Sequence, residues 1–197
     1  MPHVQRRLLQ DLVFYGRLER CDAAIAQQRR AEGCGACGGR LHQAHYQRRP
    51  RGGPTGLGGT FSRRFSYCCG RCRARTTPPS VRFLGRKVYL GLVVMLLPAM
   101  GRRYPPRVVA LVRGSLGPSL RTFRRWLAFW TELVPRSTFW KTARARLMPP
   151  VDEAALPASL VDRFASGDDY ADVERALAFV GPITTATAMT TTPASRR

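Results

Sequence analysis

Two CxxC pairs constrain this chain more than any other feature of its sequence. Cys34 and Cys37 form the first pair, Cys69 and Cys72 form the second, and 31 residues separate the two pairs. A two-residue spacer lets a tight turn direct two thiolates at one ion, so two such turns complete a tetrahedral site with four sulfur ligands. The sequence therefore predicts one structural Zn²⁺ held by these four cysteines.

The segment around the two pairs has little else to hold it together. From Gly33 to Thr60 it is rich in Gly, Arg, Pro and His and shows no apolar periodicity that would support a core. Metal binding would then supply its folding free energy, on the order of 10 kcal/mol or more as in structural zinc peptides. Residues 61–67 (FSRRFSY) alternate in part, which favours a short strand leading into the second pair. We expect a small β zinc ribbon over residues 33–80.

The sequence also permits other ligand sets and other uses of the cysteines. Cys68 stands beside Cys69 and would replace it through a three-residue spacer, while His42 or His45 would replace one thiolate. A redox CGAC pair or simply buried thiols are the metal-free alternatives, although Gly-Gly-Arg after Cys37 is a poor start for the helix that a redox pair normally opens.

The positions of the cysteines and the lengths of the apolar runs indicate the cellular compartment in which the protein is expected. Five of the six cysteines fall between residues 34 and 72, and charged residues interrupt every apolar run near the N-terminus, so we expect neither a secretory signal nor a disulfide framework. The most apolar run, Val88 to Met100, contains Pro98 and falls well short of the about 20 residues needed to cross a bilayer. We expect a cytoplasmic protein without membrane association, in which this run is a core helix.

The rest of the pattern is helical. An N-terminal helix is expected within residues 1–32, and helices broken near Pro105 and Gly117 are expected within residues 81–150, where Ser137 or Thr138 would cap a further short helix. Residues 151–181 read as an acidic segment of short helices, and residues 182–197 read as a disordered tail. The predicted fold class is mainly α with a small β zinc ribbon.

Positive charge is concentrated in the middle of the chain. The whole sequence has 33 Lys and Arg against 12 Asp and Glu, a formal net charge of +21. Residues 34–150 hold 23 of these cations and a single carboxylate, that of Glu132. Such a region requires counter-ions or a polyanion, so nucleic acid is the partner that the sequence favours most.

One helical stretch has the order of a helix-turn-helix motif. Gly117 permits a tight turn after one helix, and Pro118 or Ser119 begins the next. In that second helix an apolar stripe from Phe123 to Val134 would face the core. Its outward face would present DNA-reading groups: Ser119, Arg121, Thr122, Arg124 and Arg125. Arginines of the ribbon would add phosphate contacts, namely Arg63, Arg64 and Arg73.

The segments CGACGG, RRFSYCCGRCRART and SLGPSLRTFRRWLAFW together resemble the zinc-ribbon and helix-turn-helix portion of bacterial insertion-sequence transposases. The resemblance covers roughly residues 33–147. It implies that Cys34, Cys37, Cys69 and Cys72 hold zinc. It also implies that the outward face of residues 119–125 contacts DNA.

The sequence offers no catalytic centre that we can identify. A transposase nuclease would need three carboxylates around two metal ions, whereas the acidic residues after position 151 lie in short segments with no sheet to orient them. We therefore expect a DNA-binding protein of mobile-element type that is not an enzyme. The alternatives are an RNA-binding or ribosome-associated zinc ribbon, or a protein-interaction scaffold. The acidic C-terminal helices are expected to contact either a protein partner or the chain's own basic surface.

Overall fold

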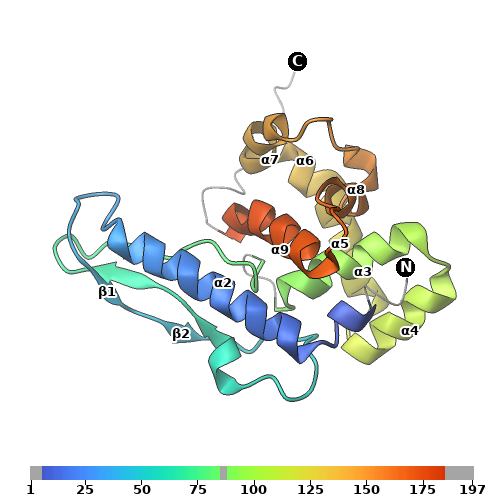
Figure 1. The fold of residues 1–197 in the computed structure, drawn as a ribbon, viewed down its shortest axis with the longest axis horizontal. Coiled ribbons are helices and arrows are strands. Elements are labelled where there is room, and N and C mark those ends of the chain that lie inside the picture. Colours follow the sequence, from blue (N-terminus) through green and yellow to red (C-terminus); the bar gives the residue numbers. More distant parts are fainter. Residues whose placement is uncertain (1–5, 85–87, 185–197) are drawn as a thin grey trace.

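The structure, a computed structural model, describes residues 6–84 and 88–184 (Figure 1). It confirms the predicted fold class, because helices predominate and the strands form two small antiparallel sheets. The N-terminal prediction is tested only from Arg6 onward. Of the tail predicted to be disordered, residues 185–197 lie outside the described residues, and Gly181–Thr184 forms a short 3-10 helix, η5.

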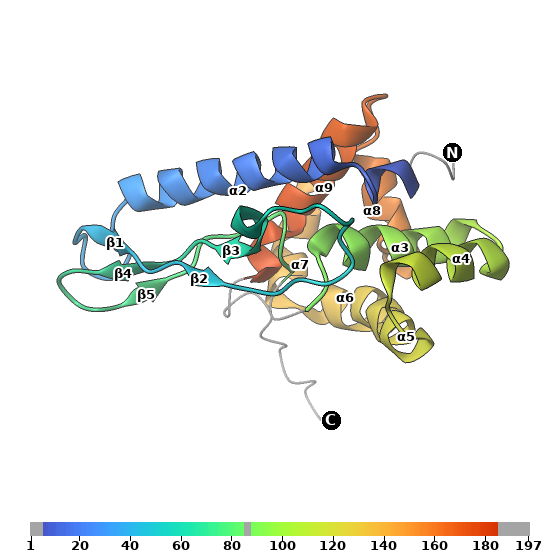
Figure 2. The same ribbon diagram turned by 90° about the horizontal axis from the view of Figure 1, so that it is seen from below.

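Helix α2, Leu12–Ala31, extends beside both parts of the molecule. It starts where the Asp11 side chain accepts hydrogen bonds from the backbone N–H groups of Val13 (2.9 Å) and Phe14 (3.3 Å), a standard N-terminal cap. The ribbon lies along its C-terminal half and the other helices lie at its N-terminal end (Figure 2). α2 thus connects the ribbon to the helical part of the chain.

The ribbon consists of a three-stranded sheet in the order β1-β4-β5 and a two-stranded sheet of β2 and β3. In the first sheet Leu41 pairs with Cys69, and Tyr67 pairs with Thr76. The bounds are β1 Leu41–Gln43, β2 Tyr46–Gln47, β3 Arg63–Arg64, β4 Tyr67–Cys69 and β5 Arg75–Thr76, with the 3-10 helix η1 at Gly59–Ser62. These strands are short because the local sequence has few apolar residues with which to extend them.

The expected breaks near Pro105 and Gly117 both appear. They separate α3 Gly91–Arg103, α4 Pro106–Leu116 and α5 Leu120–Ala128. Gly117 has φ 82°, a left-handed conformation that glycine adopts without steric cost. Every residue of α3 from Gly91 to Met100 is buried, so α3 is the central helix of the bundle.

Helix α5 continues into a π-helical turn, Phe129–Leu133, before α6 Val134–Arg136. The wider π turn shifts the buried face along the helix, so Phe129 is buried while Leu133 is 46% exposed. The apolar stripe predicted from Phe123 to Val134 was therefore wrong at Leu133. A regular 3.6-residue period does not anticipate this shift.

The remaining helices close the bundle. They are α7 Thr138–Ala143, α8 Ala158–Arg163 and α9 Asp169–Val180, with the 3-10 helices η3 Arg144–Arg146 and η4 Glu153–Ala155. Ser137 caps α7 through the Trp140 N–H (3.1 Å), and Asp168 caps α9. Leu160, Val173 and Leu177 belong to the same buried cluster as α3. The acidic segment after residue 151 thus contributes to the central core.

None of the described helices is both long enough and apolar enough to cross a membrane.

Candidate metal centre and basic surface

Four cysteine sulfurs meet at the end of the ribbon, and together they have the geometry of a metal site. The Sγ atoms of Cys34, Cys37, Cys69 and Cys72 all lie within 4.8 Å of one another. Cys34 Sγ lies 3.6 Å from Cys72 Sγ, and Cys37 Sγ lies 3.5 Å from Cys69 Sγ. A metal–sulfur distance of about 2.3 Å in a tetrahedron places two sulfurs about 3.8 Å apart. The cluster therefore fits one tetrahedral ion.

The two CxxC turns have the same backbone geometry. In the first turn Gly38 N–H donates to Cys34 O (2.8 Å), and in the second Arg73 N–H donates to Cys69 O (3.1 Å). The residue after the second cysteine is left-handed in both, with φ 69° at Gly38 and φ 62° at Arg73. Arg73 thus occupies a position that suits glycine, at a conformational cost of roughly 1–2 kcal/mol.

Gly39 is the residue that the sulfur cluster most requires to be small. A Cβ atom at this position would lie 3.0 Å from Cys69 Sγ and 3.3 Å from Cys37 Sγ. Both distances are shorter than ordinary van der Waals contacts, so a side chain here would push two of the four sulfurs aside. The glycine therefore allows the backbone to approach the metal centre closely.

The thiols differ in acidity because their surroundings differ. The backbone N–H of Cys72 donates to Cys69 Sγ, and this bond contributes most to lowering the pKa of Cys69 to about 6. The N–H of Ala74 favours the Cys72 thiolate, but the sulfurs of Cys37 and Cys34 outweigh it and raise the pKa of Cys72 to about 12. Four thiolates at this separation repel one another, and a bound cation removes that conflict.

The alternative ligands lie outside the cluster. Cys68 alternates with Cys69 along β4, so its side chain points to the opposite face of the strand, and its Sγ contacts Arg73 O at 3.5 Å. His45 Nδ1 lies 2.9 Å from Ser66 O and 3.1 Å from Ser66 N. Among the described residues, the group that could hold a metal comprises Cys34, Cys37, Cys69 and Cys72 and does not include Cys68, His42 or His45.

A second, small buried cluster joins the metal centre to α2. Leu41, Tyr67 and Ala26 pack beside Cys34 and Cys69. The Tyr67 hydroxyl donates to the backbone carbonyl of Ala26 (2.9 Å). The metal site is therefore fixed to a long helix as well as to its own strands.

The side chains predicted to contact DNA on α5 fall into two groups. Arg121, Arg124 and Arg125 are exposed, and within the described part of the chain they form no ion pair. Ser119 caps the helix instead, because its Oγ accepts from the Thr122 N–H (3.2 Å) and lies 3.1 Å from Thr122 Oγ1. The two hydroxyls therefore serve the helix start, while the three guanidiniums face solvent.

The predicted ribbon contacts also divide. Arg63 and Arg73 are exposed, as expected of residues that contact phosphate. Arg64 is only 3% exposed, and its Nη2 donates to the carbonyl of Pro78, so the structure corrects its assignment as a DNA contact. Neighbouring side chains on β3 point to opposite faces, and the face that holds Arg64 is the buried one.

The acidic C-terminal helices pair with the chain's own arginines. Glu174 pairs with Arg17 of α2, and Asp162 pairs with Arg103 of α3. Glu153 accepts from Arg144 Nη1 (2.8 Å). Of the two predicted uses of these carboxylates, the structure shows contact with the chain's own arginines, which join α8, α9 and η4 to the rest of the molecule.

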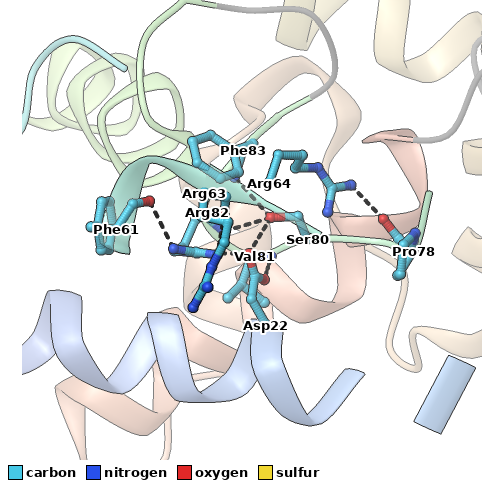
Figure 3. Close-up of polar contacts among 9 residues, drawn as sticks. All are labelled: Asp22, Phe61, Arg63, Arg64, Pro78, Ser80, Val81, Arg82 and Phe83. Atoms are coloured by element: carbon cyan, nitrogen blue, oxygen red, sulfur yellow. Dashed lines mark hydrogen bonds and ion pairs between the residues drawn. The ribbon is translucent and has the colours of Figure 1, made fainter. Parts of the chain in front are cut away.

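Sequence reasoning missed a buried ion pair between α2 and the segment after the ribbon (Figure 3). Asp22 and Arg82 have fully buried side chains, and Arg82 Nε donates to Asp22 Oδ2 at 2.8 Å. Asp22 also accepts from Ser80 Oγ (2.6 Å) and Val81 N (2.7 Å). These residues lie about 60 positions apart, and the only sequence signal is a lone carboxylate on the apolar side of α2.

No family model, curated protein or solved structure matches this chain.

Proposed function

We propose that this chain is a zinc-stabilised DNA-binding protein of mobile-element type that has no catalytic centre of its own. The observation that carries the proposal is the uncompensated arginine surface. Within the described residues, the ion pairs of Arg17, Arg103 and Arg144 join different helical segments of the bundle, and that of Arg175 lies within α9. Exposed arginines of the ribbon and α5 take part in none of the ion pairs of the described residues. A surface of this kind attracts a polyanion and releases its counter-ions on binding.

Contacts through Tyr89 support a single continuous surface formed by the ribbon and α5. Arg51, in the Gly-rich loop of the ribbon, pairs with Tyr89 in a short β-bridge. The Tyr89 hydroxyl donates to Gly117 O (3.2 Å) in the turn before α5, and its ring lies 4.9 Å from the ring of Trp126. The loop and the start of α5 therefore contact the same side chain and keep a fixed relation to each other.

In the proposed mechanism the metal supplies rigidity, and the chain's own residues bind DNA. Zn²⁺ suits the donor set, because four thiolates are the ligands of many structural zinc sites. Arg121, Arg124 and Arg125 would enter the major groove, where guanidiniums pair with guanine or clamp phosphate. Arg63 and Arg73 would contact the phosphates of the DNA backbone. The mobile-element assignment rests on the resemblance of residues 33–147 to insertion-sequence transposases.

One observation favours RNA as the alternative ligand. Tyr46 is 41% exposed and lines a hollow of about 380 Å³ together with Arg75 and Thr77. An accessible aromatic ring beside a guanidinium is a platform on which an unpaired base can stack. Competition between duplex DNA and a structured RNA distinguishes the two ligands.

The test measures binding of the zinc-loaded full chain to a labelled random-sequence duplex at several salt concentrations. Replacing Arg121 and Arg124 by Ala should reduce the slope of log K against log salt by about 1.8, since each lost phosphate contact removes about 0.9. The matched control replaces Arg6 and Arg20, two exposed arginines outside the proposed surface, and removes the same charge. Equal slopes for both double variants, or no binding by the wild type, would contradict the proposal and favour a protein-interaction scaffold.

A further inference from the structure

A hollow of about 490 Å³ opens beside the β2–β3 hairpin, on the ribbon but away from the metal site. Its lining is cationic and polar: Gln47, Arg48, Arg49, Gly59, Thr60, Ser62 and Arg63. No carboxylate is among the described residues that line it. Guanidiniums combined with hydroxyl and amide donors are the groups that proteins use to bind phosphate oxygens.

The walls of this hollow are fixed by backbone contacts. Gln47 pairs with Arg63 across the hairpin, and Arg48 N–H donates to Ser62 O (2.8 Å). Phe61 lies between the lining residues Thr60 and Ser62 in η1 and is buried. Its ring is edge-on to the ring of Tyr15 in α2, with 5.5 Å between the ring centroids. The lining arginines therefore project from a rigid frame, which lowers the entropy cost of binding a ligand.

The buried Asp22–Arg82 pair holds the same wall from inside (Figure 3). Arg82 Nη1 donates to Phe61 O (2.7 Å), and Arg82 Nη2 donates to Arg63 O (2.9 Å). The Asp22 carboxylate orients this guanidinium through its Nε. The pair thus positions the backbone of η1 and β3, from which Thr60, Ser62 and Arg63 reach the hollow.

Positive charge is in excess behind the hollow as well as in it. Burial is the main cause that lowers the pKa of Arg64, and the positive charges of Arg48 and Arg82 lower it further, against the opposing effect of Asp22. The guanidiniums of Arg48 and Arg82 lie 5.1 Å and 5.2 Å from the ring centroid of Phe83. Asp22 pairs with Arg82, and the nearby buried Arg64 has a nitrogen, Nη1, without a hydrogen-bond partner among the described residues, so an anion bound in the hollow would offset positive charge here.

We propose that this hollow binds a phosphate group of the DNA backbone and so provides a fixed contact separate from α5. Arg49 and Arg63, both exposed, would donate to the phosphate oxygens, with Thr60 and Ser62 as additional donors. The source of the phosphate rests on the proposed function, whereas the phosphate chemistry rests on the hollow alone. This contact would set the position of the ribbon along the duplex.

Gly59 allows the hollow to be tested without changing any arginine. Gly59 is exposed, and a Cβ atom at its position would have no neighbour within 4 Å, so a side chain is accommodated there. Gly59→Glu places a carboxylate beside the guanidiniums, and Gly59→Gln is the uncharged control of the same shape. Loss of one phosphate contact should weaken duplex binding about tenfold at about 50 mM salt and reduce the salt slope by about 0.9. Gly59→Gln should bind within about twofold of the wild type.

A second measurement makes the result independent of DNA. Thermal unfolding of the zinc-loaded variants is compared in inorganic phosphate and in chloride at equal ionic strength. A phosphate that binds the folded state raises the unfolding temperature. Because phosphate also stabilises proteins generally by exclusion from their surface, the informative quantity is the difference between Gly59→Gln and Gly59→Glu. We expect phosphate to raise the unfolding temperature of Gly59→Gln more than that of Gly59→Glu.

The outcomes separate the two proposals. Duplex binding that is weakened by Gly59→Glu and retained by Gly59→Gln supports both. Duplex binding that is the same in the wild type and both variants overturns the phosphate site and leaves the proposed function in place. Absence of duplex binding, with phosphate stabilising Gly59→Gln alone, overturns DNA as the source of the phosphate. If duplex binding and differential stabilisation are both absent, neither proposal holds.

Discussion

Gly39→Ala should weaken metal binding more than any other single methyl group added in the ribbon. The new Cβ atom would lie 3.0 Å from Cys69 Sγ, 3.3 Å from Cys37 Sγ and 3.0 Å from Arg71 Cβ. Two of these neighbours are proposed metal ligands, so relief of the contact displaces sulfurs from the tetrahedron. Overpacking of this kind costs about 1–3 kcal/mol, which corresponds to a loss of about 5- to 150-fold in metal affinity.

Gly38→Ala is the matched control for that substitution. Gly38 adjoins Gly39, but a Cβ atom there has no neighbour within 4 Å. Its cost comes only from φ 69°, a conformation that Arg73 already adopts in the second turn. We therefore expect Gly38→Ala to lose about 1 kcal/mol of stability without moving a sulfur.

The assay is competition for Zn²⁺ against a chromophoric chelator, under reducing conditions, on the full-length chain. Thermal unfolding of both metal-free variants serves as a check that each one folds. Equal metal affinities of Gly39→Ala and Gly38→Ala would contradict the described geometry, in which Cys37 and Cys69 are ligands of one ion and Gly39 lies against both.

Three further substitutions test other parts of the structure. Asp22→Asn leaves the Arg82 guanidinium buried without its counter-charge and should lower the free energy of unfolding by about 3–5 kcal/mol, measured by urea denaturation; a loss below about 1 kcal/mol would contradict the buried pair. Arg73→Gly removes a left-handed arginine and should stabilise the zinc-loaded protein by about 1 kcal/mol in the same assay, whereas a destabilised variant would show that the turn differs from the first one. The hydrogen bond from Trp140 Nε1, together with Arg144, lowers the pKa of Glu153, so its stabilisation is complete above the ordinary pKa of 4.5 and is lost as pH falls through the lowered value. Glu153→Gln should therefore flatten the acid limb of the stability–pH curve, and an unchanged limb would argue against the contact.

The local elements were predictable because their causes lie within a few residues. Ser137 and Asp168 cap helices through groups two or three positions away, and Gly117 ends α4 by its own backbone freedom. The four cysteines were predictable for the same reason, since each CxxC turn is closed by its own backbone hydrogen bonds. These features require no knowledge of what the segment packs against.

The face of an element on which a side chain lies, and how deeply it is buried, were harder to predict, because both depend on neighbours distant in sequence. Arg63 and Arg64 are indistinguishable by composition, yet the pairing of β3 with β2 leaves the first exposed and buries the second. The π turn after α5 buries Phe129 in place of Leu133. In both cases the predicted type of element is correct, but a shift of its pattern by one position changes which residue is exposed.

The sequence alone was enough to predict the cluster of four cysteines, the helix breaks near Pro105 and Gly117 and the concentration of positive charge, because each depends on residue type and short-range spacing. Only the tertiary structure decided that Asp22 pairs with Arg82, that the acidic helices join the central core, and that three lining arginines share one hollow. The physical reason is that these arrangements depend on burial and on contacts across about 15 to 160 positions of chain, where desolvation rather than local propensity selects the partner.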